Sequence, residues 1–190
     1  MQQQIALSGL GGQGVLYVTK LLAEAALRHD LSVLVSETHG MAQRGGNVIS
    51  HLKVFPRIEA PCASLGGSLT SRSLTSPLIR PGRADVLLAL HEEGLAAHGY
   101  LLKPGGAVFC NRPNPQGAGD LDAVSIAKKL GDAVAANLVL LGFAATSGIL
   151  FCTVDDVKEV LRQSGGSRVE LGIKAVEAGA RAAREPKRKA

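Results

Sequence analysis

The chain has 190 residues, of which 46% are hydrophobic and 3% aromatic, and it carries a formal net charge of +5. This length and composition fit one soluble globular domain whose core rests on aliphatic side chains. No apolar run approaches the roughly 18 residues of a membrane span. Because the N-terminus leads directly into a predicted strand, we expect no signal peptide, no membrane partner and a cytoplasmic location.

The positive charge is concentrated at the C-terminal end of the chain. The last ten residues contain five basic side chains and one acid, whereas residues 1–180 are close to neutral. We interpret residues 1–185 as a single α/β domain and residues 186–190 as a basic tail. No aromatic platform or recognition motif accompanies the charge, so nucleic acid is not an expected partner.

The three cysteines, Cys62, Cys110 and Cys152, are far apart in the sequence and include no C-x-x-C pair. This spacing matches neither a disulfide framework nor the ligand set of a zinc or iron–sulfur site. We interpret the three residues as small reduced thiols. The chain is therefore expected to hold no metal or cluster of its own.

The chain begins with a predicted strand, a glycine turn and a helix. The turn consists of Gly9, Leu10, Gly11, Gly12, Gln13 and Gly14, which satisfy the spacing G-x-G-x-x-G. Residues 15–28 follow with an apolar stripe at three- and four-residue steps. The start of such a helix favours an anion, so a phosphate, a carboxylate or an acidic side chain of a partner would each fit. The alternative is that the glycines only let helix and strand pack closely.

A polar loop follows the next predicted strand, residues 31–35. Its notable residues are Glu37, His39, Gln43, Arg44, Gly45 and Gly46. Arg44, followed by two glycines, can extend over a phosphate or a carboxylate. In a dinucleotide-binding fold Glu37, 23 residues after Gly14, would hydrogen-bond a ribose. The structural alternative is a surface loop held by a Glu37–Arg44 pair.

The predicted strand after this loop, residues 47–55, alternates as a half-exposed strand should, with His51 and Lys53 on the outer face. The loop before it is too short for a parallel crossover, so the two strands are expected to be antiparallel. Residues 56–82 read as a long surface excursion. A buried strand at 85–90, a short helix at 91–98 and a strand at 107–110 follow.

The remaining chain is mostly helical, with expected helices at 122–130, 133–141, from Thr153 onward, and 169–184. In the last of these, Leu171, Ala175, Ala178 and Ala182 form the expected apolar side. The predicted fold is a three-layer α/β/α domain with a mostly parallel, mixed sheet and a helical C-terminal third.

Two stretches together go beyond general α/β patterns. Residues 9–15 (GLGGQGV) and 37–46 (ETHGMAQRGG) resemble the gamma-type subunit, or domain, of the 2-oxoacid:ferredoxin oxidoreductases of the pyruvate/ketoisovalerate family. Residues 84–89 and 137–142 fall where that family has similar segments. The form of the second stretch is most similar to the small (beta) subunit of indolepyruvate ferredoxin oxidoreductase. The segment Cys62–Ser76 and the basic tail depart from the family pattern.

The resemblance implies a subunit of an enzyme that decarboxylates a 2-oxoacid on thiamine diphosphate, passes electrons through iron–sulfur clusters to ferredoxin, and forms an acyl-CoA. This chain lacks the Gly-Asp-Gly…Asn-Asn signature of a thiamine diphosphate site, so the cofactors and CoA are expected on a larger catalytic partner or in the assembled complex. No catalytic residue is assigned to this chain. The candidate anion-, CoA- or partner-facing residues are Gly9, Gly11, Gly12, Gln13, Gly14, Arg44, Gly45 and Gly46.

Two other hypotheses remain at this point. The chain could be a free-standing Rossmann-like protein that binds NAD(P) or a flavin at the glycine turn, or a scaffold in which the glycines serve packing alone. Without its partner, exposed apolar surface would also favour a homodimer of the isolated chain.

Overall fold

The computed structural model describes residues 2–38, 45–57 and 76–185. The strands of this part are β1 (Gln3–Leu10), β2 (Leu31–Thr38), β3 (Asn47–Pro56), β4 (Ala84–Ala89), β5 (Leu102–Asn111) and β6 (Asp120–Leu121). They form one six-stranded sheet in the order β2-β3-β1-β4-β5-β6. Within it β3 is antiparallel to both of its neighbours, while β1, β4, β5 and β6 are parallel. The mostly parallel, mixed sheet expected from the sequence is confirmed.

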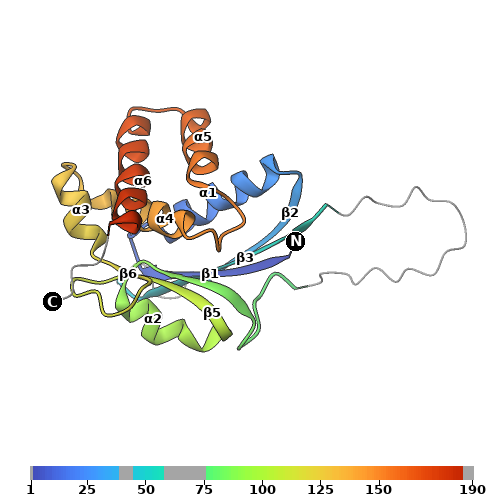
Figure 1. Cartoon of the computed structure of the whole chain (residues 1–190). Coiled ribbons are helices and arrows are strands. Elements are labelled where there is room, and N and C mark those ends of the chain that lie inside the picture. The colour runs from blue at the N-terminus through green and yellow to red at the C-terminus, as the bar shows by residue number, and fades with distance from the viewer. Residues whose placement is uncertain (1, 39–44, 58–75, 186–190) are drawn as a thin grey trace, which may run out of the picture.

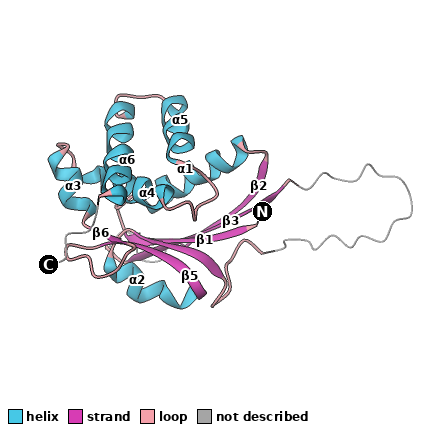
Figure 2. Ribbon diagram, viewed as in Figure 1, coloured by secondary structure: helices cyan, strands magenta, loops and turns pink. Residues whose placement is uncertain are grey.

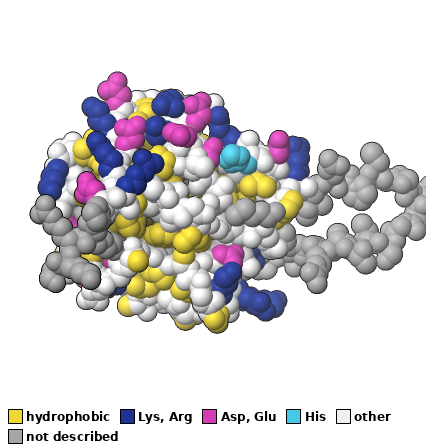
Figure 3. All heavy atoms as spheres, viewed as in Figure 1, with side chains coloured by type: hydrophobic (Ala, Val, Ile, Leu, Met, Phe, Trp, Pro, Cys, Tyr) yellow, Lys and Arg dark blue, Asp and Glu magenta, His cyan; other side chains and the backbone are white. Residues whose placement is uncertain are grey.

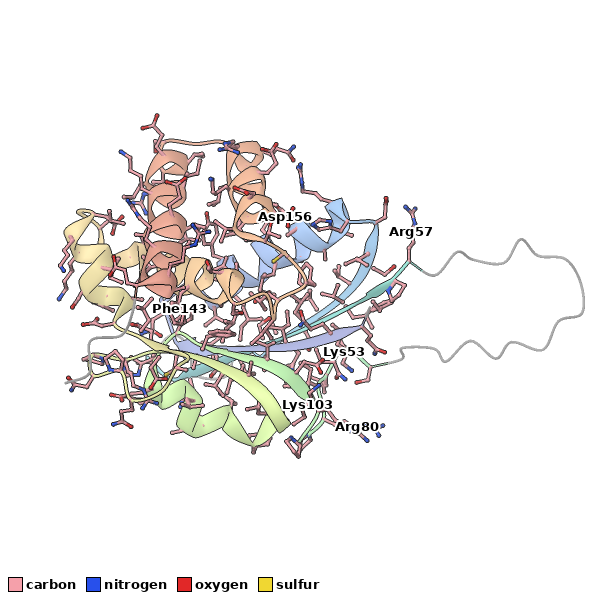
Figure 4. The ribbon with its side chains drawn as sticks, viewed as in Figure 1. Lys53, Arg57, Arg80, Lys103, Phe143 and Asp156 are labelled. Carbon is pink, nitrogen blue, oxygen red and sulfur yellow. The ribbon has the colours of Figure 1, made fainter. Side chains whose placement is uncertain are left out.

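Helices cover both faces of the sheet (Figures 1 and 2). They are α1 (Val15–Arg28), α2 (Glu92–His98), α3 (Ala123–Lys129), α4 (Ala136–Thr146), α5 (Val154–Ser164) and α6 (Val169–Arg184), with short 3-10 helices η2 (Gly99–Leu101) and η3 (Ala133–Ala135). Of the described α-helices, α2 alone lies on the lower face in the view of Figure 1. The main core lies between the upper face and the other helices, where Phe143 of α4 meets Phe109 of β5 edge to face at 6.1 Å between ring centroids (Figure 4). None of the described helices is long and apolar enough to cross a membrane.

The prediction that β3 is half exposed is wrong. His51 and Lys53, expected on a solvent face, are only 6% and 9% exposed. The chain after residue 75 covers that face: Lys53 Nζ donates to the Ser76 carbonyl at 2.9 Å, and the Ile79 N–H donates to His51 Nδ1 at 3.3 Å. Burial lowers the pKa of both His51 and Lys53. Alternation within the strand could not reveal that a later segment of the chain covers this face.

Three elements also differ from the sequence prediction. β5 begins at Leu102 and not at residue 107, because the chain from Lys103 to Gly106 stays in the sheet with a shift of register opposite Ala84 and Val86. β6 was not predicted, since two residues carry no periodic signal. The helix expected from residue 133 starts as a 3-10 turn and becomes α4 at Ala136.

Helices α4 and α6 pack closely because glycines lie at their contact. An added Cβ at Gly142 of α4 would lie 2.0 Å from the Val176 carbonyl oxygen, and one at Gly179 of α6 would lie 1.9 Å from that of Val139. The buried face of α6 is therefore shifted from the expected one. It consists of Gly172, Ala175, Val176, Gly179 and Ala180.

A capping box starts α5 and ties it to α1. Thr153 Oγ1 accepts from the Asp156 N–H, and Asp156 Oδ2 accepts from the Thr153 N–H at 2.7 Å. Asp156 Oδ1 also lies 3.1 Å from Nε2 of His29, at the end of α1. Figure 4 shows Asp156 between the two helices. Burial pushes the pKa of Asp156 upward, but the bonds from Thr153 and His29 outweigh it, so this pKa lies below its usual value.

We expect Asp156→Asn to lower the free energy of unfolding by about 1 kcal/mol at pH 7. Because the folded-state pKa is depressed, this contribution is complete above the unfolded-state pKa of about 4 and is lost as the pH falls through the folded value. Urea unfolding of both proteins between about pH 7 and pH 2 should show the difference shrinking in acid. A difference that stays constant over this range would contradict the assignment.

Candidate functional site

The glycine turn connects β1 to α1 at the carboxyl edge of the sheet. Gly12 and Gly14 have φ angles of +87° and +80°, a left-handed conformation that favours glycine. Gly14 is the N-cap of α1, and the first turn of that helix contains no acid. The helix therefore directs the positive end of its dipole into the turn without an acid of its own to balance it.

Gln13 stabilises the turn from within. Its Oε1 accepts a hydrogen bond from the Leu10 N–H at 2.8 Å, and the Gln13 N–H donates to the Leu10 carbonyl at 3.2 Å. The side chain thus folds back onto the turn. Asn137, at the start of α4, donates from Nδ2 to the Gln13 carbonyl at 3.1 Å. Sequence reasoning did not single out Asn137 as a site residue, and a polar side chain opening an otherwise apolar helix was the signal available.

Gly46, which follows Gly45 just before β3, contacts the glycine turn of residues 9–14. The Gly11 N–H donates to the Gly46 carbonyl at 3.1 Å, which places the start of β3 beside the end of β1. Gly45 has a φ of +74°. Arg44, together with His39 and Gln43, lies outside the described residues. The structure therefore brings Gly45 and Gly46 to the same edge as the candidate residues of the first turn.

Glu37 does not occupy the place of a ribose-binding acid. It lies near the end of β2, and β3 separates β2 from β1. With strands about 4.8 Å apart, Glu37 is displaced by about 10 Å across the sheet from the end of β1. In a dinucleotide fold the corresponding strand is the direct neighbour of β1. The inserted antiparallel strand removes this part of the expected dinucleotide geometry.

Three hollows of the described surface meet at Gly12. One of about 320 Å³ lies towards α6 and includes Tyr17, Asp132 and Arg168 in its lining. A second of about 340 Å³ lies between the turn and Val48, and a third of about 220 Å³ lies towards Leu90 and Asn111. Carboxyl ends of parallel strands are where open α/β sheets usually receive ligands. Together the hollows surround the tip of the glycine turn.

The rim of these hollows is notably apolar. Leu16, Tyr17 and Val134 are 36%, 43% and 64% exposed, respectively. Burial of its ring, and then the charge of Glu24, raises the pKa of Tyr17, so its hydroxyl remains a hydrogen-bond donor at neutral pH. Large apolar side chains exposed around a concave edge are typical of a surface that meets another protein.

Buried polar groups hold the strand ends that frame the third hollow. Asn111 Nδ2 donates to the Leu90 carbonyl at 3.1 Å, and its Oδ1 accepts from the Ala123 N–H at 3.0 Å. Arg112 Nε lies 3.6 Å from Asp120 Oδ2, which also accepts from the N–H groups of Gln116 and Gly117. The bonds fix the loop between β5 and β6, so this wall of the edge is preorganised.

The described residues do not fit the metal cofactors of a redox enzyme. Cys110 and Cys152 are buried free thiols, and Cys62 lies outside the described part. Burial raises the pKa of Cys110, and it raises the pKa of Cys152 to about 12, so both thiols are protonated at neutral pH. Across residues 2–38, 45–57 and 76–185, no three His, Cys, Asp or Glu side chains gather as a metal site. Nothing in this part is suited to an iron–sulfur cluster or to the metal of thiamine diphosphate.

Comparison with known proteins identifies the family. The profile of the family described as "Pyruvate ferredoxin/flavodoxin oxidoreductase" matches residues 4–182, and the chain belongs to this family. It is 29% identical to indolepyruvate oxidoreductase subunit IorB of Archaeoglobus fulgidus, with 94% of each chain covered. It is 28% identical to IorB of Thermococcus kodakarensis, with 97% of each covered. The family resemblance drawn from the two glycine-containing stretches is confirmed.

Solved structures show the same fold. The gamma subunit of a keto/oxoacid ferredoxin oxidoreductase from Geobacter sulfurreducens is 24% identical, with a TM-score of 0.69 and coverage of 96% of this chain and 98% of that one. A 2-oxoglutarate:ferredoxin oxidoreductase chain from Magnetococcus marinus gives a TM-score of 0.71 at 20% identity. The match covers 99% of this chain but only 32% of that one. The fold thus occurs both as a separate subunit and as part of a longer chain.

Proposed function

We propose that the chain is the small, non-cofactor-carrying subunit of a cytoplasmic 2-oxoacid:ferredoxin oxidoreductase, of the type that acts on indolepyruvate. The complex decarboxylates a 2-oxoacid oxidatively, forms an acyl-CoA and reduces ferredoxin. Thiamine diphosphate and iron–sulfur clusters on the larger subunit supply the carbon and electron chemistry. The small subunit completes the assembly. Family membership and the relatives named indolepyruvate oxidoreductase subunit IorB support this proposal.

The observation that carries the proposal is the apolar, hollowed carboxyl edge around Gly12. Its rim exposes Leu16, Tyr17 and Val134, a set that a free-standing protein would normally cover. The competing hypothesis is a free-standing dinucleotide-binding protein. It gains no support from the relatives, nor from Glu37, because β3 separates this residue from β1. We assign this edge as the docking face for the large subunit.

We further propose that the glycine residues at 9, 11, 12 and 14, with Gln13 and the Arg44-Gly45-Gly46 segment, border the path of CoA in the assembled enzyme. The positive end of α1, uncompensated by an acid in its first turn, suits a phosphate group. Tyr17 and Arg168 in the adjoining hollow add a hydroxyl donor and a cation. These groups would position the coenzyme and would not transfer protons or electrons.

Val134→Glu tests the docking face. Val134 is 64% exposed, so the change should leave folding intact, while a buried unpaired carboxylate at an interface should weaken assembly at least about tenfold. The measurement is co-purification of the tagged chain with its large subunit under anaerobic conditions, scored by iron–sulfur absorbance and oxoacid-dependent ferredoxin reduction.

Tyr100→Glu is the matched control. Tyr100 is 62% exposed, but it lies in η2, just before the first residue of β5. It is therefore at the amino ends of the parallel strands, opposite the carboxyl ends that surround Gly12. The Tyr100→Glu variant should assemble with the large subunit as the natural chain does. If Val134→Glu assembles normally as well, the docking face is elsewhere. If the natural chain purifies colourless and alone with a bound nucleotide, the proposed function is wrong.

A further inference from the structure

The two outer edges of the sheet are built differently. β2 runs for eight residues without Pro, Lys or Arg, and its ladder with β3 is continuous from Leu31 to Thr38. The opposite edge ends in β6, which has two residues and begins with Asp120. Short length, charge, proline and bulges are the usual means of blocking edge-to-edge pairing of sheets. β6 is short and carries a charged residue, whereas residues 31–36 of β2 have none of these protective features.

The edge of β2 can accept another strand. Within the described part of the chain, the backbone of β2 pairs with β3 alone. Apolar side chains lie next to the edge: Val35 is 38% exposed, and Leu27, at the end of α1, is 57% exposed. A hollow of about 390 Å³ beside the first half of the strand is lined in part by Leu27, Leu31 and Val33. In Figure 3, yellow side chains reach the surface at this end of the molecule.

The sequence of β2 is self-complementary. Residues 32–36 read Ser-Val-Leu-Val-Ser in both directions, with Leu34 at the centre. If two copies pair antiparallel about a two-fold axis at Leu34, each Ser32 faces Ser36, each Val33 faces Val35, and Leu34 faces itself. Directly opposite residues share a face of the sheet, so valine meets valine on one side and leucine meets leucine on the other.

In other registers the two strands no longer pair each side chain of residues 32–36 with one of its own kind. Centring the pair on Val33 or on Val35 places Leu34 opposite a serine in both cases, and an odd shift would reverse the faces. In the register centred on Leu34, Glu37 of the second copy comes opposite Leu31. There it approaches the exposed Asp30–Arg57 ion pair, whose guanidinium can receive a second carboxylate. Arg57 is labelled in Figure 4.

We propose that two copies of this chain pair through the edge of β2, antiparallel and about a two-fold axis at Leu34, so that their sheets become one continuous sheet. Such an interface is isologous, and a closed dimer protects both edges at once. The edge runs along the side of the sheet, whereas the docking face around Gly12 lies at the strand ends. The two interfaces therefore use separate surfaces, and pairing through β2 does not require the proposed function to hold.

Cross-linking at the axis tests the register. In the full chain with Leu34→Cys, the two new thiols would sit on residues whose Cα atoms are about 4.5–5.5 Å apart, within disulfide range. On mild oxidation we expect most of the protein to run at twice the chain mass on a non-reducing gel. The natural chain, with its own three cysteines, sets the baseline.

Ser32→Cys is the matched control on the same strand. Its two copies would be four residues apart along the ladder, about 13 Å, which is too far for a disulfide. It should not cross-link to itself. An equal mixture of Ser32→Cys and Ser36→Cys chains should instead give a cross-linked heterodimer, because these positions face one another.

Charge at the axis gives an independent measurement. Leu34→Lys and Leu34→Glu should each convert the dimer seen by light scattering into a monomer, with an unchanged circular dichroism spectrum. Mixing the two variants should restore a one-to-one dimer. A monomeric natural chain, a dimer that Leu34→Cys does not cross-link, or equal cross-linking by Ser32→Cys alone would each overturn the proposal.

Discussion

Gly179→Ala is expected to lower the free energy of unfolding by about 3 kcal/mol, although alanine is the better helix former. The added Cβ would lie 1.9 Å from the Val139 carbonyl oxygen and 2.8 Å from the Phe143 backbone nitrogen. Both obstacles are backbone atoms of α4, so no side-chain rotation can relieve them. The two helices would have to separate, which would loosen the packing of Val139 and Val176. Urea unfolding of the isolated chain measures the loss.

Gly172→Ala is the control in the same helix. Its Cβ would meet a methyl of Leu138 at 3.2 Å and methyls of Leu161 at 3.5 Å, and these are flexible side-chain ends. Because alanine gains up to about 1 kcal/mol of helix propensity, this variant should stay within about 1 kcal/mol of the natural chain. Equal stability of the two variants would mean that α4 and α6 are not in backbone contact at Gly179.

Gly14→Ala is expected to destabilise the chain by about 2–3 kcal/mol and to impair the assembled enzyme. Gly14 has a φ of +80°, and an added Cβ would lie only 2.3 Å from Asn137 Nδ2. The clash would break the hydrogen bond from Asn137 to the Gln13 carbonyl and reshape the turn. If the turn borders the CoA path, the KM for CoA should rise at least about tenfold while the KM for the oxoacid stays unchanged.

Gly12→Ala separates the effect of backbone strain from the effect of a steric clash. Its φ is +87°, but no heavy atom of the described residues lies within 4 Å of the added Cβ, so it tests the left-handed backbone without that clash. Combining Gly14→Ala with Asn137→Ala removes the clash and should recover part of the lost stability. If Gly12→Ala destabilises the chain as much as Gly14→Ala, the contact with Asn137 is not responsible. Unchanged kinetics for CoA in Gly14→Ala would reject the CoA path.

Local features of the fold were predictable from the sequence, because they depend on neighbours in the chain. The succession of strand, glycine turn and helix near the N-terminus, observed as β1, the turn and α1, follows from periodicity and from glycine spacing. The short connection between the second and third predicted strands, residues 36–46, was enough to indicate their antiparallel pairing, which the ladder from Leu31 to Thr38 confirms. The start of α5, with Thr153 as its N-cap, could also be predicted from the sequence.

Features that depend on distant partners were not predictable in this way. The burial of His51 and Lys53 arises from the segment after residue 75, which no local pattern announces. The buried face of α6 follows the glycines that approach α4, whereas hydropathy pointed to Leu171 and Ala178. At the site, the sequence marked the glycines but not Asn137, whose contact with the turn spans 124 positions.

The central position of β1 has a consequence for synthesis. Its partners in the sheet are β3 and β4, so Ile5 cannot complete its pairing until Val86 has been made. The glycine turn must wait longer, since Asn137 is 124 residues downstream of Gln13. At about 5–20 residues per second, a ribosome needs roughly 6–25 seconds to add that length. Until β3 and β4 have been made, the nascent N-terminus is an apolar strand without its sheet partners, which makes it a natural client for chaperones.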